Sequence, residues 1–181
     1  MITFLKKRSY DLVCMFVTQL AISLFGLALA FAVPVNQAAL RIGTSIFSVL
    51  FYLFLIYTRL WELGYKDHNS FKRGENGLSR LEGLYMGIGA SAINLIVALL
   101  ILLGWFSANG VIDAIAGGAT VTALLTEGMY IGILSTSVNG ITLNSIPFMY
   151  FVITLPLIVT SLIAYLAGSH DFKLLGSNKK Q

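Results

Sequence analysis

The chain has 181 residues, of which 57% are hydrophobic and 11% are charged. Soluble domains carry roughly 25% charged residues, so this composition excludes a water-soluble globular protein and predicts an integral membrane protein. Residues 1–181 form a single membrane domain, with room for about four to six spanning helices but not for a large soluble catalytic domain. The net charge of +4 matters less than the positions of the charges.

Four apolar segments are long enough to cross a bilayer. In chain order they cover residues 12–33, 42–60, 84–106 and 147–167. The first follows a basic cluster and ends before Pro34, and it is longer than the apolar region of a signal peptide. We therefore predict an all-α polytopic membrane helix bundle with four principal transmembrane helices.

Two less apolar stretches connect these segments. Residues 61–83 contain balanced basic and acidic side chains, which predicts a solvated loop rather than a polybasic patch for lipid or nucleic acid. Residues 107–145 combine glycines, Asp113 and Glu127 with moderately apolar pieces, and we interpret them as an outer segment with a re-entrant or interfacial helical element. The alternative, a fifth full crossing, would bury Glu127 near mid-membrane at about 2.5–3.5 kcal/mol.

The basic residues predict the orientation of the chain. With four spans, all of the 12 Lys and Arg residues except Arg41 lie on one side of the membrane. Because basic residues favour the inner side, both termini and loop 61–83 are predicted to be cytoplasmic. Short loops and the lack of an organellar targeting segment favour a bacterial cytoplasmic membrane. Trp61 and Trp105 fall near predicted boundaries and are candidate interface anchors.

Two heptapeptides raise the possibility of a duplicated hairpin. Trp61–Asp67 and Tyr165–Asp171 both read aromatic, any residue, small or apolar, Gly, any residue, basic, Asp. As a duplication, they predict two hairpins related by a pseudo-twofold axis along the membrane normal. The alternative is convergence, because an aromatic anchor, a glycine cap and a basic residue suit any helix that leaves a bilayer.

Small residues at four-residue spacing predict close packing between helices. Gly83, Gly87 and Ser91 provide such a face in segment 84–106, and Gly26 provides a lesser one in segment 12–33. We assign these four residues to helix packing.

Asn94, Asp113 and Glu127 are the candidate ligand- or ion-binding residues. An acidic, glycine-interrupted outer element with unwound carbonyls favours cations, and it predicts a vestibule for a cation or a basic peptide. A solvated cap over the bundle is the alternative.

The sequence contains no recognisable enzyme signature. It has no HExxH zinc motif, no Walker-type phosphate loop and no pair of carboxylates within the apolar spans. Cys14 is the only cysteine and therefore cannot form a disulfide or a CxxC pair. We expect no catalytic residue, no metal site and no cofactor.

Three functions remain. The first is a non-catalytic subunit of a membrane complex or a small homo-oligomer, with lipids and membrane subunits as partners and no nucleic acid. The second is a small-solute transporter or substrate-binding membrane subunit. The chain is similar in size and helical character to the substrate-binding components of energy-coupling-factor transporters, although those usually have six helices. The third is a lipid-modifying enzyme that uses Asp67, Asp171, His68 and His170 at the inner interface.

Overall fold

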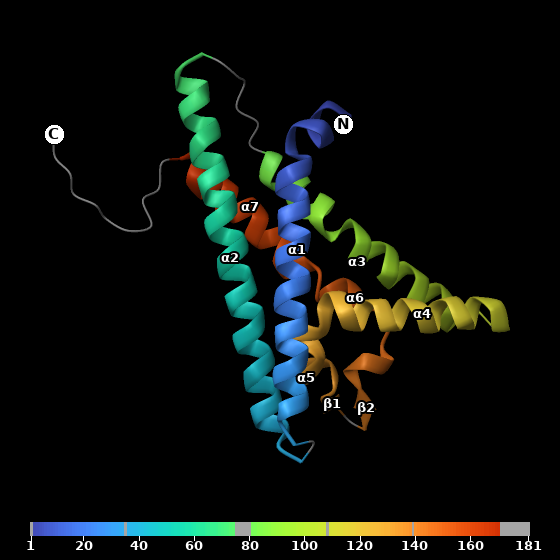
Figure 1. Cartoon of the computed structure of the whole chain (residues 1–181). Coiled ribbons are helices and arrows are strands. Elements are labelled where there is room, and N and C mark those ends of the chain that lie inside the picture. The colour runs from blue at the N-terminus through green and yellow to red at the C-terminus, as the bar shows by residue number, and fades with distance from the viewer. Residues whose placement is uncertain (1, 35, 75–80, 108, 139, 171–181) are drawn as a thin grey trace.

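The computed structural model describes residues 2–34, 36–74, 81–107, 109–138 and 140–170, with the side chains of residues 2–7 and 138 left out of the description. Within those ranges the chain forms helices and one small β-hairpin (Figure 1). The long helices are α1 (Ile2–Ala32), α2 (Ala38–Lys72), α3 (Glu82–Phe106), α4 (Gly110–Glu127) and α7 (Leu155–Ser169). The short elements are η1 (Gly128–Tyr130), α5 (Ile131–Leu134), β1 (Ser137–Val138), β2 (Ile141–Thr142), η2 (Leu143–Ser145) and α6 (Met149–Val152).

Five helical segments of the described chain are long and apolar enough to cross a membrane. They cover Arg8–Ala32, Ala38–Lys72, Glu82–Phe106, Gly110–Leu134 and Met149–Ser169. The sequence predicted four principal spans, so the count is extended by the helix within the outer segment 107–145. Its hydropathy is the lowest of the five because glycines and threonines interrupt its apolar residues.

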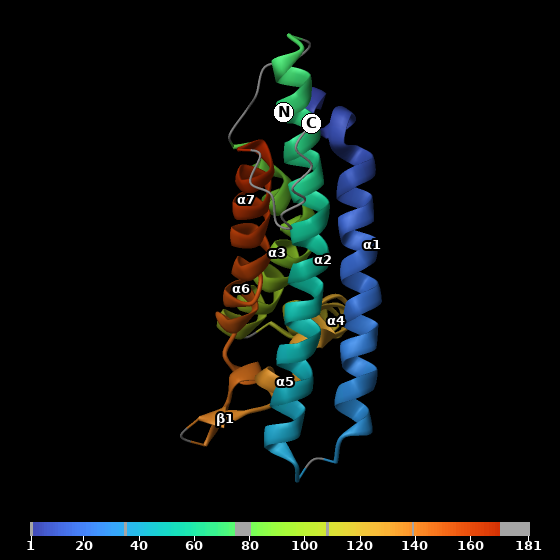
Figure 2. The same cartoon turned by 90° about the vertical axis from the view of Figure 1, so that its left-hand side faces the viewer.

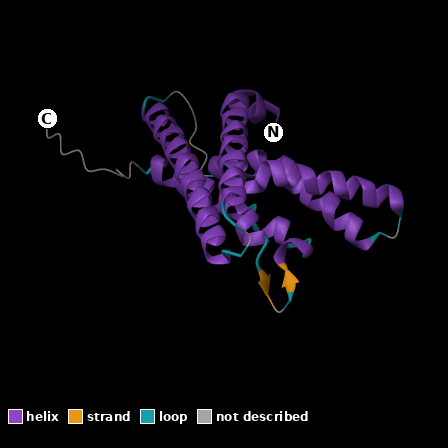
Figure 3. Ribbon diagram, turned by 60° about the horizontal axis from the view of Figure 1, so that its bottom comes forward, coloured by secondary structure: helices purple, strands orange, loops and turns teal. Residues whose placement is uncertain are grey.

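α4, the helix that the sequence did not predict as a span, is not parallel to α1 and α2. α1 and α2 lie side by side along the long axis of the bundle, whereas α4 lies across that direction in Figure 1 and is seen nearly end-on in Figure 2. Figure 3 shows α3 and α4 extending together away from the remaining helices. α4 therefore approaches α1 from the side rather than running parallel to it.

The two ends of the bundle differ. α1 begins, α2 ends, α3 begins and α7 ends at one end, which we call the Arg8 end (Figure 1). The connection between α1 and α2 lies at the opposite end together with α5 and the β-hairpin, and we call this the Arg41 end.

One boundary differs from the sequence prediction. Residues 61–83 were expected to form a loop, but α2 continues to Lys72 and α3 begins at Glu82. The continuation is helical because Leu63 and Gly64 are buried, Gly64 against α7, while Glu62, Tyr65 and Lys66 point outward. The polarity that predicted a loop belongs to the exposed face of a helix.

The closest contact between α2 and α7 is reciprocal. A Cβ added to Gly64 would collide with the carbonyl oxygen of Tyr165, and one added to Gly168 would collide with the carbonyl oxygen of Trp61. Trp61 and Tyr165 hold equivalent places in the two heptapeptides, as do Gly64 and Gly168. A local pseudo-twofold axis would produce this pattern, while the duplication of whole hairpins stays a prediction.

Other small residues also lie where helices meet. A Cβ on Gly83 would lie 2.5 Å from the Tyr165 Cβ, and one on Gly87 would lie 3.0 Å from the Ile158 Cα, so both glycines face α7. Ser91 is fully buried, and a Cβ on Gly26 would lie 2.6 Å from the Met129 Cα in η1. Trp61 stacks on Tyr65, whereas Trp105 is 63% exposed near the end of α3.

Candidate functional site

The chain breaks its helix between α4 and α5, and side chains from α1 and α2 bind the backbone at the break. The Gln19 amide donates a hydrogen bond to the Thr126 carbonyl oxygen at 3.0 Å. The Ser23 hydroxyl accepts from the Gly128 N–H at 2.6 Å, and the Ser45 hydroxyl accepts from the Gly132 N–H at 2.8 Å. Irregular backbone within a membrane protein needs such partners, so these contacts hold the break in place.

The break places Glu127 deep in the bundle. Its neighbours Thr126 and Gly128 bond to Gln19 and Ser23, which lie near the middle of the apolar part of α1. Five residues further on, Gly132 packs against the Arg41 carbonyl oxygen near the start of α2. The segment from Glu127 to Gly132 thus leads from the middle of the bundle to the Arg41 end.

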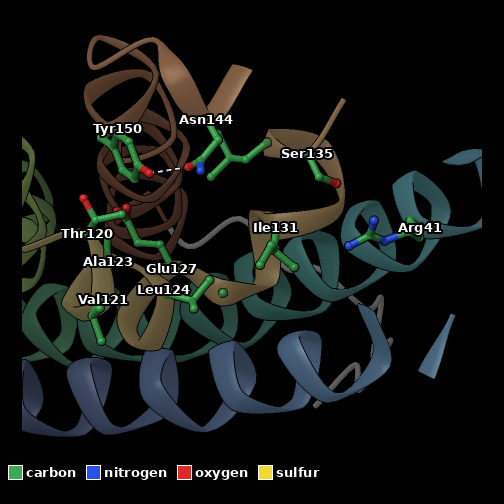
Figure 4. Close-up of a pocket in the computed structure, with 12 residues that line it drawn as sticks. Arg41, Thr120, Val121, Ala123, Leu124, Glu127, Ile131, Ser135, Asn144 and Tyr150 are labelled. Carbon is green, nitrogen blue, oxygen red and sulfur yellow. Dashed lines mark hydrogen bonds between the residues drawn. The ribbon is translucent and has the colours of Figure 1, made fainter. Parts of the chain in front are cut away.

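A cavity of about 290 Å³ follows this segment. Ligand pockets in proteins have volumes of about 300–1,000 Å³, so the cavity suits a small solute. Its lining comes from α2, α4, η1, α5, η2 and α6 and combines apolar, hydroxyl and charged side chains (Figure 4). The polar lining residues are Arg41, Thr120, Glu127, Ser135, Asn144 and Tyr150.

Glu127 is buried in this cavity without a partner. Its exposed fraction is 4%, and within the described ranges its carboxylate forms no hydrogen bond or ion pair. Tyr130 follows Glu127 by three residues, and Tyr150 lines the same cavity. The hydroxyls of Tyr52 and Tyr130 are buried and have no hydrogen-bond partner in the described structure. Buried polar groups are normally satisfied, so these two hydroxyls are exceptions in the described structure, although neither tyrosine lines the cavity.

Arg41 lies at the other end of the same cavity. Figure 4 shows its guanidinium group directed toward Ile131 and Ser135, far from the cluster of Glu127, Thr120 and Tyr150. The Arg41 Nε is buried and unpartnered, and the ion pairs found in the described chain involve other basic residues. The cavity therefore contains one acidic and one basic side chain, and neither forms an ion pair within the described structure.

The three predicted ligand residues do not come together. Glu127 lines the cavity, but Asp113 is exposed in the first turn of α4. Asn94 is buried in α3 with its Oδ1 unpartnered, and it is not among the residues that line the cavity. Sequence reasoning missed Arg41, Asn144 and Tyr150. The one available signal was that Arg41 is the only basic residue predicted on its side of the membrane.

A second group of charges closes the Arg8 end. The Arg8 guanidinium donates to Glu82 at 2.8 Å and also to Asp67, and the Tyr165 hydroxyl lies 2.9 Å from Asp67 and 3.0 Å from Glu82. These four side chains join α1, α2, α3 and α7. Because Arg8 and Glu82 are buried and mutually paired, we assign this group to the assembly of the helices.

The Arg8 group includes one of the residues that were predicted to act in a lipid-modifying enzyme. Asp67, one of its proposed residues, is bound by Arg8 and Tyr165, and His170 is the C-cap of α7. Asp171 lies outside the described residues. Among the residues that are described, no three His, Cys, Asp or Glu side chains gather in a way that would hold a metal ion.

No protein-family model matches the chain, and no curated protein or solved structure is significantly similar to it. The function is therefore inferred from the chemistry of the site.

Proposed function

We propose that this membrane protein binds a small polar solute in the cavity between Arg41 and Glu127, as a transporter or as the substrate-binding subunit of one. The buried carboxylate of Glu127, which lines a cavity and has no protein partner in the described structure, carries the proposal. An ionisable group buried without a partner is unfavourable for stability, and a function that needs the carboxyl group explains why the chain keeps it.

The arrangement of the helices supports a site that is reached from one side only. The Arg8 end is closed by paired charges from four helices, while the cavity extends from Glu127 toward the Arg41 end. With basic residues concentrated at the Arg8 end, the positive-inside rule makes that end cytoplasmic and the Arg41 end external. In this proposal the segment Gly110–Leu134 approaches the other helices from the side, within the plane of the bilayer, and ends at the Arg41 end. The membrane is a bacterial cytoplasmic membrane.

Solute binding to the purified protein tests the proposal. The chain in lipid nanodiscs is heated in the presence of a library of small polar solutes, and unfolding is followed by the fluorescence of Trp61 and Trp105. A solute present at 100 times its dissociation constant stabilises the folded state by about 2.7 kcal/mol. We expect at least one solute to raise the unfolding temperature of the native chain and not that of Glu127→Gln.

Asp113→Asn is the matched control, because Asp113 is a carboxylate on the same helix but is exposed and outside the cavity. It should respond to the solutes as the native chain does. The proposal is wrong if no solute stabilises the native chain, or if every active solute stabilises Glu127→Gln equally.

Association with other membrane subunits or with further copies of the chain is a second candidate function. Its support is the α3–α4 hairpin, which extends from the bundle in Figure 3. A Cβ added to Gly117 or Gly118 of α4 would meet nothing within 4 Å. Small residues on a membrane helix permit close approach of a neighbouring helix. Native mass spectrometry of the same nanodiscs should then detect a second copy or a co-purified subunit, and a lone chain would contradict this candidate.

A further inference from the structure

Three of the polar side chains at the deep end of the cavity, those of Thr120, Glu127 and Tyr150, offer hydrogen-bond acceptors to it. The Thr120 hydroxyl already donates to the Ala116 carbonyl oxygen at 2.9 Å, and the Tyr150 hydroxyl donates to Asn144. What these two hydroxyls offer to the cavity is therefore their oxygen lone pairs. Glu127 adds a carboxylate, which in its ionised form only accepts, and Figure 4 shows the three side chains together at one end.

This group of acceptors fits a ligand that is rich in donors and positively charged. A protonated primary amine has three N–H donors and one positive charge, and it could bond to Glu127, Tyr150 and Thr120 together. A neutral or anionic group would leave the Glu127 charge unpaired in the same place.

The other end of the cavity has the opposite character. Arg41 offers guanidinium N–H donors and a positive charge, which bind carboxylate or phosphate groups well. The two sites lie apart along the cavity, because Glu127 precedes Gly132, the residue that packs against the Arg41 carbonyl oxygen, by five residues, or about 7.5 Å of helix at 1.5 Å per residue. A ligand whose two charges share one carbon atom would not reach both.

We propose, on the basis of the solute-binding function above, that the ligand is a zwitterion with an amine at one end and an anionic group at the other. The amine binds at Glu127, Thr120 and Tyr150, and the anionic group binds at Arg41. ω-Amino acids and short peptides belong to this class. An ordinary α-amino acid with an uncharged side chain does not, because its amine and carboxylate are attached to the same carbon.

Four commercially available probes test this class. 6-Aminohexanoate has both charges at opposite ends, while its isomer 2-aminohexanoate has both at one end. Hexylamine carries the amine alone, and hexanoate carries the carboxylate alone. Binding is measured by thermal shift and by calorimetry in nanodiscs made without phosphatidylethanolamine, so that no lipid headgroup supplies the amine.

We expect 6-aminohexanoate to bind at least about tenfold more tightly than the other three probes, because each lost charge-assisted contact reduces affinity about tenfold or more. Arg41→Gln should reduce its binding to the level of hexylamine and leave hexylamine itself unaffected. Glu127→Gln should weaken both 6-aminohexanoate and hexylamine. In discs that contain phosphatidylethanolamine, binding of 6-aminohexanoate should be unchanged.

Several results would overturn the proposal. If 2-aminohexanoate or hexylamine binds as tightly as 6-aminohexanoate, or if Arg41→Gln has no effect, the ligand does not use both charges. If phosphatidylethanolamine displaces the probe, the site belongs to a lipid headgroup rather than to a free solute. If none of the four probes binds while other solutes in the library do, this ligand class is wrong and the solute-binding function stands; if nothing binds, both are wrong.

Discussion

Two groups of similar polar side chains in the bundle differ in whether their members are bonded to one another. At the Arg8 end, a basic residue, two carboxylates and a tyrosine from four helices are bonded to one another. In the cavity that runs from the middle of the bundle to the Arg41 end, the side chains of a basic residue, an acidic residue and a tyrosine form the lining, and the basic and acidic groups remain apart. Charges that are paired within the protein stabilise its helices in one arrangement. Charges that are kept apart around a cavity are available to a ligand, and this difference is the basis of the functional assignment.

We expect the largest loss of stability from a substitution that breaks the ion pairs at the Arg8 end. Arg8→Gln leaves the carboxylates of Asp67 and Glu82 without their cation, and removal of one partner from a buried ion pair costs about 3–5 kcal/mol. Denaturant unfolding in detergent micelles measures this loss. Arg59→Gln is the matched control, since its ion pair with Asp11 is longer, at 3.3 Å, and partly exposed. It should cost less than about 1 kcal/mol, and an equal loss in both variants would contradict the structural role of the Arg8 group.

The next largest loss of stability is expected at the close contact between the backbones of α2 and α7, near the Arg8 end. Gly64→Ala adds a methyl group where the Tyr165 carbonyl oxygen lies, and we expect a loss of about 1–3 kcal/mol from overpacking. Gly43→Ala is made in the same helix near the Arg41 end, where nothing lies within 4 Å. It should leave stability unchanged or raise it by up to about 1 kcal/mol, because alanine favours the helix. Equal effects of the two changes would show that α2 and α7 separate easily at Gly64.

The smallest expected change in stability is a gain rather than a loss, and it concerns the cavity between Arg41 and Glu127. Glu127→Gln removes a buried carboxyl group that has no protein partner in the described structure, so we expect it to stabilise the unliganded protein by about 1–2 kcal/mol under conditions in which that carboxyl group is ionised. Thermal unfolding without solute measures the change. Asp113→Asn removes an exposed carboxylate from the first turn of α4, where it interacts favourably with the helix dipole, and should destabilise by about 0.3–1 kcal/mol. A large loss of stability in Glu127→Gln would show that Glu127 has a structural partner.

The candidate site was predictable only in part. Glu127 and Asp113 were both predicted as ligand-binding residues, because each is an acidic residue within a moderately apolar segment. Hydropathy does not distinguish them, since burial depends on which face of α4 meets α1. The helix break places Glu127 at the level of Ser23 in the bundle, and it depends on hydrogen bonds from Gln19, Ser23 and Ser45. The partners of these side chains lie about 90 to 110 positions away in the chain.

The sequence by itself determined the class of the protein, a set of helices long and apolar enough to cross a membrane. Long apolar segments must be shielded from water, and a helix is the simplest element that satisfies its own backbone in a bilayer, so composition and segment length suffice. Tertiary structure decided that Arg8 is paired with Asp67 and Glu82, that Gly110–Leu134 approaches from the side, and that Arg41 and Glu127 share a cavity. These outcomes depend on contacts between residues far apart in the chain, and a local pattern of hydropathy contains no information about which of them will meet.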